Sequence, residues 1–337
     1  MTDLTPITYT DTAHTSEKFL WPRSEPCHHG KRFRLSAASG QRLAFRHPTE
    51  ALFPARELVD MPPKRLRELE QMPNHSPRPS DRPEHPLRWD EECLRYTSQT
   101  KINFFIGIIR GLGMVSFFLV LFAAVVSLIA MYFASKSPQS DFNYNDILSD
   151  LIPVYIYILF FCLLMWGGAN LLYRFFPNYT SGYQRGPMWE LNRRTGMVKV
   201  FANSAKKSTA WKIAHELPFH EFDCYIQSSP TSQGIAQYNL SLVHYSVEAH
   251  VALVGMFGVT SRLDQLAAWD MLQRFMDTSQ PLPDSPQWEQ FRSLDPTTLE
   301  WDKEIARPPR YWRDMDDETF NQKIVELQNR LSAFYFG

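Results

Sequence analysis

The chain has 337 residues, enough for two domains, and its 35 Lys and Arg residues nearly balance 36 Asp and Glu residues. A net charge of −1 gives no electrostatic reason to expect a nucleic-acid partner, and a mean hydropathy of −0.32 limits membrane segments to a few local stretches. Four widely spaced cysteines without a CxxC motif argue against a disulfide framework or a zinc ribbon.

The first hundred residues combine short helical pieces with a proline-rich stretch. Residues 1–72 begin without the apolar core of a signal peptide, and we predict a cytoplasmic N-terminal region with helical pieces in 49–61 and 63–72. Residues 73–100 begin with PNHSPRPSDRPEHP, which favours an extended linker leading into a juxtamembrane segment. The CHHG sequence at 27–30 has no second ligand cluster, so we interpret it as a loop and predict no metal.

Two long uncharged stretches follow the linker. Residues 111–134 contain 24 residues without a charge, and residues 151–173 contain another 23. A helix needs about 20 apolar residues to span a bilayer. We therefore predict transmembrane helices over 102–134 and 151–173, joined by an external loop at 135–150.

The charges beside the two spans give the chain a direction in the membrane. The loop has three acidic residues and one lysine, whereas both outer flanks are basic. The basic residues are Arg88, Arg95, Lys101 and Arg110 before the first span, and Arg174, Arg185, Arg193 and Arg194 after the second. Because basic flanks stay inside, we predict that both termini are cytoplasmic and that the loop lies outside.

Arg110 lies among apolar residues at the inner end of the first span. We expect its side chain to reach the cytoplasmic headgroups, and the alternative is a functional charge within the membrane. Neither uncharged stretch offers it a charged partner for a proton relay, so we do not expect a transporter or channel. The spacing of Gly107 and Gly111 is typical of closely packed helices and leaves a homo-oligomer through these helices open.

After the second span, apolar residues recur at every second position, which predicts β-strands. MWELNRRTGMVKVF at 188–201 predicts a hairpin, and further strands are expected through Trp211 and Ile213, over 221–227, and in AQYNLSLVHYSV and HVALVGMFGV. A helix capped by Ser261 follows. Several antiparallel strands closed by one helix are the order of a pleckstrin-homology-like (PH-like) domain, which we place at 185–280. The predicted fold class is α+β: a two-helix transmembrane hairpin plus a cytoplasmic antiparallel β domain with C-terminal helices.

Residues 281–337 are predicted to be an aromatic, proline-rich segment that ends in a helix. The helix repeats apolar residues at alternating spacings of four and three, which favours packing on the chain's own domain over pairing with a second copy or a partner. Within the same segment, Arg310, Tyr311, Trp312 and Arg313 have the composition of an interface hot spot. The alternative for these four residues is an intramolecular clasp of aromatic and Arg–Asp contacts.

Motifs for nucleotide binding, nucleophilic hydrolysis and zinc proteolysis do not occur in the sequence. We therefore predict a membrane-anchored binding protein that is not an enzyme, has no cofactor, and contacts the lipid bilayer and another protein. The alternative is a regulator whose PH-like domain binds lipid headgroups. The basic candidates for that role are Arg193, Arg194, Lys199, Lys206 and Lys207.

Three stretches, together with the two spans, resemble a family of proteobacterial inner-membrane proteins that contain a domain of unknown function. The stretches are MWELNRRTGMV, LPFHEFD at 217–223 and LDPTTLEWDKEIARPPRYWRDMDDETF at 294–320, and the resemblance covers roughly residues 85–320. Members are similar to proteins encoded beside type VI secretion and polymorphic-toxin genes. The resemblance implies a bacterial inner membrane and an immunity or accessory role through contact with a secretion-system effector or component. It implies no catalytic residue.

Overall fold

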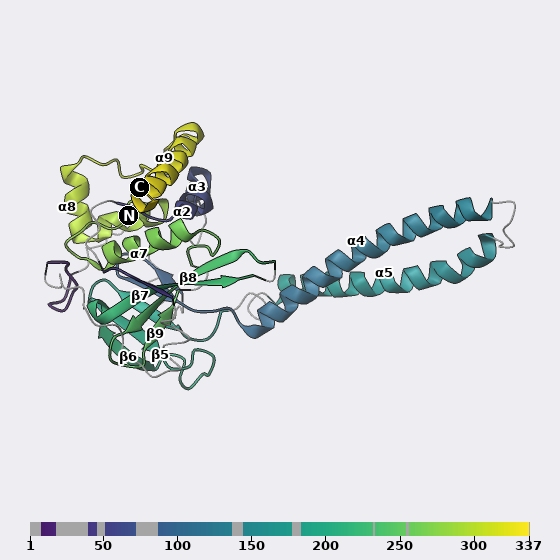
Figure 1. The fold of residues 1–337 in the computed structure, drawn as a ribbon, viewed down its shortest axis with the longest axis horizontal. Helices are drawn as coiled ribbons and strands as arrows, with labels where there is room; N and C mark the ends of the chain where they lie inside the picture. The colour runs from purple at the N-terminus through teal and green to yellow at the C-terminus, as the bar shows by residue number, and fades with distance from the viewer. Residues whose placement is uncertain are drawn as a thin grey trace. The chain divides into compact units, whose positions relative to one another are not determined.

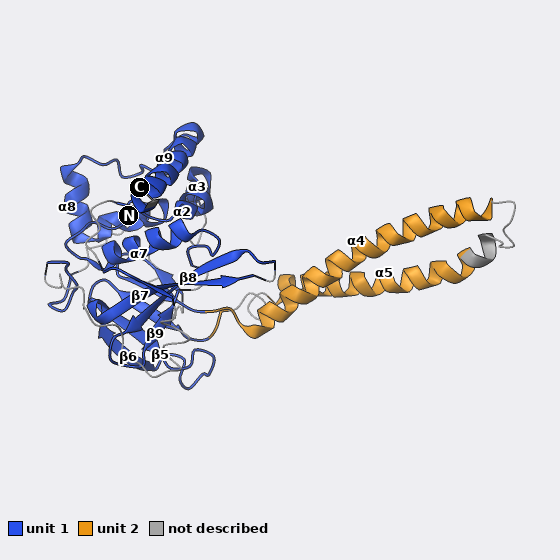
Figure 2. Cartoon of the chain, in the orientation of Figure 1, with its two compact units in different colours: residues 1–97, 185–337 blue, residues 98–184 orange. Residues whose placement is uncertain are grey.

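The structure is a computed structural model of the chain and describes residues 8–17, 40–45, 51–71, 87–136, 144–176, 183–231, 233–253 and 256–336. The chain divides into two units (Figure 2). Unit 1 combines residues 1–97 with residues 185–337, and unit 2 is formed by residues 98–184. Unit 2 is therefore an insertion in the sequence of unit 1.

A five-stranded antiparallel sheet in unit 1 uses strands from both sides of this insertion. Its order is β2 (Arg88–Trp89), β3 (Cys93–Tyr96), β4 (Trp189–Asn192), β5 (Met197–Phe201) and β6 (Ile213–Pro218). β3 and β4 are neighbours, with Tyr96 opposite Trp189 and Cys93 opposite Asn192. The insertion thus connects two adjacent strands. Our sequence interpretation differs here, because it assigned residues 73–100 to a linker and began the β domain at residue 185.

The hairpin expected at residues 188–201 is confirmed as β4 and β5. Leu191 and Val198 are opposite each other in the ladder, and both are fully buried. The turn between the strands includes Gly196 at a φ of 70°, where a Cβ would also lie 2.6 Å from the backbone nitrogen of His14. A side chain is excluded there by both conformation and space. The strand expected through Ile213 is confirmed as β6.

A four-stranded antiparallel sheet contains the other strands described in unit 1. Its order is β1 (Gln41–Leu43), β7 (Phe222–Pro230), β8 (Ala236–His244) and β9 (His250–Ala252), which confirms the three expected strands that became β7, β8 and β9. β7 and β8 pair along their whole length, from Phe222–His244 to Pro230–Ala236. β1 pairs with β7 only as far as Ile226. The far ends of β7 and β8 therefore extend past β1 as a two-stranded arm (Figure 1).

Helices pack in layers on this second sheet. α7 (Arg262–Met276) packs on β7 and β8, and α9 (Asp317–Phe336) packs on α7 and on α2 (Ala55–Asp60). Ser261 caps α7 as predicted, because its side chain accepts a hydrogen bond from the backbone N–H of Asp264. Asp270 of α7 is buried, and the hydroxyl of Tyr335 on α9 donates to its carboxylate. The other helical elements described in unit 1 are α3 (Pro63–Glu70), the 3₁₀-helices η2 (Phe219–Glu221) and η3 (Pro286–Leu294), and α8 (Pro296–Glu304).

The apolar seam of the terminal helix packs on the chain itself. Phe320, Leu327 and Leu331 of α9 are buried within the shared core of unit 1, and Ile324 and Phe334 pack beside them. This agrees with the interpretation that the seam docks intramolecularly. Unit 1 is therefore a mixed domain of helices and antiparallel sheets, as the α+β prediction required.

Unit 2 consists of two antiparallel helices, α4 (Lys101–Ser135) and α5 (Tyr144–Phe175) (Figure 1). Both are long and apolar enough to cross a membrane, since their most apolar segments have mean hydropathies of 2.7 and 2.1, and only 6% of each is buried in the structure. The side chains that they leave exposed include Phe118, Leu119, Phe160 and Phe161. Such surfaces are unfavourable in water and suited to lipid.

A few polar and close contacts join α4 to α5. The hydroxyl of Tyr173 donates to the side chain of Asn103 at 2.8 Å, and a Cβ on Gly113 would lie 2.7 Å from the backbone nitrogen of Trp166. The two helices therefore approach closely at Gly113, whereas a Cβ on Gly111 would meet no described atom within 4 Å. The guanidinium of Arg110 lies 5.5 Å from the centre of the Tyr173 ring, close to the end of α5. This position is consistent with an interfacial Arg110.

Candidate functional site

The aromatic cluster expected to bind a partner is largely part of the fold. Trp312 is only 5% exposed and contributes to the core of unit 1. Its indole N–H donates to Asp284 at 3.0 Å, and its backbone N–H donates to Glu289 at 2.5 Å. Trp312 therefore belongs to an intramolecular clasp, the alternative given above. Its ring is already buried by the chain and is not available to a partner.

The residues beside Trp312 also bind within unit 1. Arg310 pairs with Glu70 of α3 at 2.6 Å, and Arg313 pairs with the buried carboxylate of Glu289 at 3.2 Å. The ring of Tyr311 lies 5.1 Å from the guanidinium of Arg307. These contacts fasten the segment to α3 and η3, so the cluster is a structural clasp with Arg310 at its exposed edge.

The five basic residues considered for lipid headgroups do not share one surface. Arg193 is fully buried, Arg194 donates to the backbone of Thr8, and Lys199 lies between Glu190 and Glu216. Lys206 and Lys207 are exposed on the loop between β5 and β6. The prediction of one headgroup site from all five is therefore wrong, because Arg193 has no access to a ligand and Lys199 is already neutralised by carboxylates.

Arg193 instead holds three distant segments together. Its guanidinium donates to Asp295 at 2.9 Å and to the backbone carbonyls of Phe275, Asp277 and Gln280 at 2.5–2.8 Å. Burial acts to raise the pKa of Asp295, but the guanidinium outweighs it and holds that pKa below its ordinary value. The pair is charged and fully hydrogen-bonded, so Arg193 links the β4–β5 turn to the end of α7 and the start of α8.

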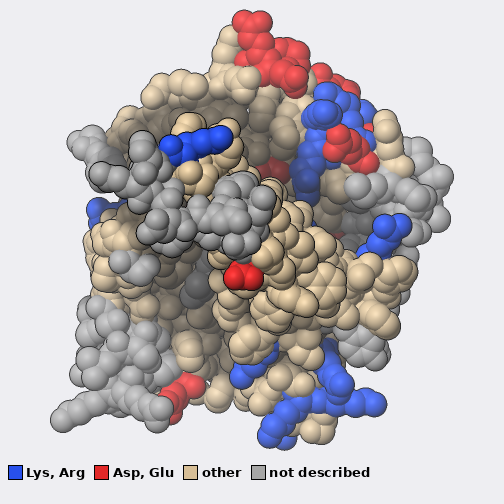
Figure 3. Space-filling model, turned by 90° about the vertical axis from the view of Figure 1, so that its right-hand side faces the viewer, with Lys and Arg blue, Asp and Glu red and all other residues tan. Residues whose placement is uncertain are grey.

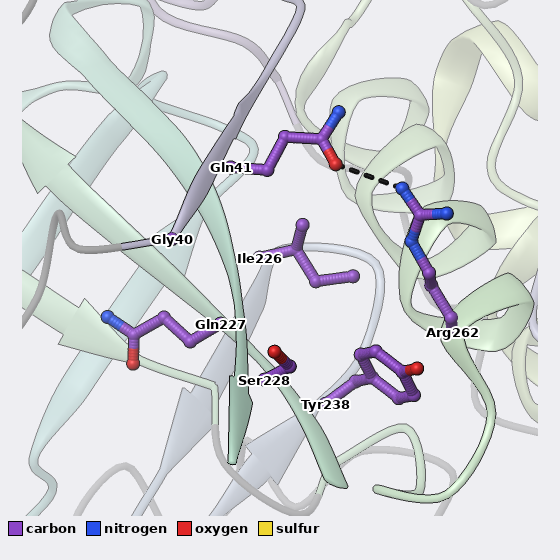
Figure 4. Close-up of a pocket in the computed structure, with 7 residues that line it drawn as sticks. All are labelled: Gly40, Gln41, Ile226, Gln227, Ser228, Tyr238 and Arg262. Atoms are coloured by element: carbon purple, nitrogen blue, oxygen red, sulfur yellow. Dashed lines mark hydrogen bonds between the residues drawn. The ribbon is translucent and has the colours of Figure 1, made fainter. Parts of the chain in front are cut away.

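A pocket in unit 1 brings polar groups together where the arm of β7 and β8 leaves the sheet (Figure 4). It has a volume of ≈ 530 Å³ and is lined by Gly40, Gln41, Ile226, Gln227, Ser228, Tyr238 and Arg262. These residues come from β1, β7, β8 and the first turn of α7. Sequence analysis predicted none of them as site residues.

Local structure explains how these side chains converge. Ser228 and Tyr238 are directly opposite in the β7–β8 ladder, so their side chains share one face of the arm with Ile226. Figure 4 shows these three side chains on the side that faces Arg262, whereas Gln227 points away. Gly40 permits the approach of β1, because a Cβ there would lie 2.0 Å from the carbonyl oxygen of Ile226. The pocket therefore lies on this face of the arm, between Gly40 and the first turn of α7.

Arg262 makes this pocket suited to an anion. One guanidinium nitrogen donates to the side-chain oxygen of Gln41 at 2.9 Å, and within the described part of the chain Arg262 forms no ion pair. The hydroxyls of Ser228 and Tyr238 lie on the same side and supply further donors. A guanidinium with adjacent hydroxyls binds a carboxylate through charge-assisted hydrogen bonds.

The histidines and acidic residues of unit 1 do not assemble into a metal site in the part of the chain that the structure describes. His244 binds the carboxylate of Glu221 at 2.8 Å through Nε2, and its Nδ1 accepts from the backbone N–H groups of Ser246 and Val247. It therefore closes the turn after β8. The CHHG sequence lies outside the described residues.

The chain was also compared with known proteins. No protein-family model, no curated protein and no solved structure matches it.

Proposed function

We propose that this chain is a membrane-anchored binding protein without enzymatic activity, and that unit 1 binds a protein partner through an accessible carboxylate. Unit 2 is the anchor, placed in a bacterial inner membrane with both termini in the cytoplasm. The basic flanks support this direction, and the exposed apolar side chains of α4 and α5 support the insertion.

The Arg262 pocket is the observation that carries the binding role. Its guanidinium has no carboxylate partner among the described residues, and Ser228 and Tyr238 on the neighbouring face of the arm line the same pocket. An Asp or Glu side chain, or a chain terminus, from a partner would complete the site.

The family resemblance suggests which partner this is. It favours an effector or a component of a type VI secretion or toxin system, and hence an immunity or accessory role. Along the chain, four strands (β3 to β6) are followed by three strands (β7 to β9) and one helix (α7), and this order supports a PH-like fold for unit 1. In such a fold, β1 and β2 would be additional strands. A PH-like scaffold serves protein recognition as readily as lipid recognition, so function still depends on the site.

A peptide-selection experiment on the full chain tests this proposal. The protein, embedded in phosphatidylcholine nanodiscs, is used to select from a phage-displayed library of random dodecapeptides. We expect the selected peptides to contain Asp or Glu, or a required free C-terminus. Arg262→Gln should weaken their binding by about ten- to hundredfold, the value of one charge-assisted hydrogen bond of about 1.5–3 kcal/mol.

Arg65→Gln is the matched control, since Arg65 is an exposed arginine on α3. It should leave binding of the same peptides unchanged. If the selected peptides lack a carboxylate, or bind the Arg262 variant as tightly as the original protein, the pocket is not the binding site. Failure of the chain to remain with the nanodiscs would instead refute the anchor.

A further inference from the structure

The loop between β5 and β6 is basic and carries no acidic residue. Residues 195–215 contain four lysines and no Asp or Glu. Three of these lysines, Lys206, Lys207 and Lys212, are exposed, and none forms an ion pair within the described residues. Figure 3 shows basic side chains gathered at the lower edge of the face it draws, the level at which Figure 1 places β5 and β6.

Large apolar side chains are exposed beside these lysines. Trp211 is 38% exposed and Ile213, the first residue of β6, is 42% exposed. The indole N–H of Trp211 is already satisfied, since it donates to the carbonyl of Arg185 at 3.1 Å. The exposed part of the ring, which elsewhere packs on Phe201 and Arg95, can therefore enter an apolar region without burying an unpaired donor. Tryptophan and lysine together are the combination found where proteins meet the bilayer interface.

Contacts within unit 1 fix this loop beside the points where the chain leaves and re-enters the unit. The backbone N–H of Gly186 donates to the carbonyl of Ser204 at 3.1 Å, and a Cβ on Gly186 would lie 1.9 Å from the carbonyl oxygen of Ala210. The hydroxyl of Thr97 donates to the carbonyl of Gly186 at 2.8 Å. Thr97 is the last residue of unit 1 before unit 2, and Arg185 is the first after it.

Chain length then limits how far the loop can be from the anchor. α4 begins at Lys101, and four extended residues reach at most about 14 Å. Whatever orientation unit 1 adopts, Thr97 stays within this reach of the first turn of α4. If α4 crosses the membrane, as the proposed function holds, the loop remains close to the bilayer surface.

We propose that Lys206, Lys207, Trp211, Lys212 and Ile213, here named the loop surface, bind the anionic phospholipids of the membrane that unit 2 spans. The charges complement the anionic headgroups, and the apolar side chains enter the interface between headgroups and acyl chains. The inference rests on the proposed membrane anchor. The loop surface differs from the headgroup site predicted from the sequence, because it lies on an exposed loop and does not include the buried Arg193.

Lipid contact can be measured at Ser208, an exposed residue in the middle of the loop. Ser208→Cys is introduced together with Cys27→Ser and labelled with an environment-sensitive fluorophore, since Cys93, Cys162 and Cys224 are buried. The labelled full chain is placed in nanodiscs of phosphatidylcholine alone or with phosphatidylglycerol, with and without a lipid-borne quencher. We expect quenching with phosphatidylglycerol, and much less with phosphatidylcholine alone or at high salt.

Substitution of the three lysines measures their contribution. Each lysine near an anionic surface contributes about fivefold to the ratio of bound to unbound loop, so Lys206→Gln, Lys207→Gln and Lys212→Gln together should lower that ratio on the order of a hundredfold. The matched control removes three exposed charges elsewhere in unit 1, at Lys64, Arg65 and Lys303. It should leave quenching unchanged.

The outcomes separate this inference from the proposed function. A chain that stays in the nanodiscs but shows equal quenching in both lipids, or none, overturns the inference and leaves the anchor intact. Loss of quenching in the control variant as large as in the loop variant also overturns it, because the effect would then be one of total charge. A chain that does not enter the nanodiscs refutes the anchor itself and the inference with it.

Discussion

Replacing Glu57 by glutamine should stabilise unit 1 at alkaline pH and leave it almost unchanged at acid pH. Glu57 lies on α2 and is only 8% exposed, and neither of its carboxylate oxygens has a hydrogen-bond partner among the described residues. Burial, together with the nearby carboxylates of Asp60 and Asp264 and against a smaller opposing effect of Ser285, raises the pKa of Glu57 from 4.5 to about 7. Ionisation of this side chain therefore opposes folding.

The size and direction of the effect follow from proton linkage. Below pH 4.5 the carboxyl is protonated in both the folded and the unfolded chain, so it costs no stability. Between pH 4.5 and 7 the unfolded chain ionises first, and folding loses stability as the pH rises. Above pH 7 the loss is complete, and a pKa raised from 4.5 to about 7 corresponds to about 3 kcal/mol. Glutamine does not titrate, so the variant lacks this loss.

Thermal unfolding followed by tryptophan fluorescence at about pH 4 and pH 8 measures the difference. For a domain of this size, about 3 kcal/mol corresponds to an increase in Tm of about 6–12 °C, expected for Glu57→Gln relative to the original protein at pH 8 but not at the acid pH. Glu68→Gln, at an exposed position on α3, is the control and should change Tm at neither pH. An equal change in Tm for Glu57→Gln at both pH values would refute the argument, because it would show that packing and not ionisation is responsible.

Three further predictions concern stability and topology. Arg193→Met leaves Asp295 buried without its partner and should lower stability by about 3–5 kcal/mol in a chemical denaturation, whereas Arg194→Met should have almost no effect. Trp312→Ala should lower stability by about 3–5 kcal/mol while peptides selected at Arg262 still bind; retained stability with lost binding would restore the hot-spot interpretation. An impermeant maleimide should label Ser140→Cys but not Ser208→Cys in intact spheroplasts, and the reverse pattern would contradict the proposed topology.

Local patterns in the sequence were sufficient to predict much of the secondary structure in the C-terminal half of the chain. β4 and β5 alternate apolar and polar residues on either side of a turn that contains Gly196, and α9 repeats its apolar residues at helical spacing. Each pattern is contained within about 20 residues or fewer, and tertiary packing did not override it. The helix cap at Ser261 belongs to the same class, because its donor is three residues away.

β2 and β3 were missed because their burial depends on distant partners. The sequence RWDEECLRY contains charges throughout and was interpreted as part of a juxtamembrane linker. In the fold, Arg95 pairs with Glu190 of β4 at 2.6 Å, and Arg88 binds Asp90 and Glu92. These ion pairs allow charged residues inside a sheet, but the Arg95–Glu190 pair forms only when β3 meets β4, which follows unit 2 in the sequence.

Two of the candidate site residues, Arg193 and Trp312, are structural for a related reason. Composition identified Arg193 and Trp312 as recognition residues, yet Arg193 finds Asp295 102 residues later in the chain and Trp312 finds Asp284 28 residues earlier. No local sequence pattern predicted the Arg262 pocket, because its residues come from distant parts of the chain: Gln41 is 221 residues from Arg262. A side chain's partner decides whether it is a structural or a binding group, and sequence spacing does not reveal a partner at such a distance.

The insertion of unit 2 between β3 and β4 leads to a last prediction, that unit 1 folds without unit 2 provided that both of its parts are kept. Met188 donates to the carbonyl of Tyr96 at 2.8 Å, and Thr97 donates to Gly186, so the two chain ends already lie in one ladder. Joining Thr97 to Arg185 by a short Asn-Gly turn should give a soluble monomer by size-exclusion chromatography, with a Tm close to that of the full chain. A fragment of residues 185–337 alone lacks β3 and leaves the edge of β4 unpaired, so it should aggregate. If the joined chain aggregates as the fragment does, unit 1 depends on unit 2 for folding, and the membrane segment is more than an anchor.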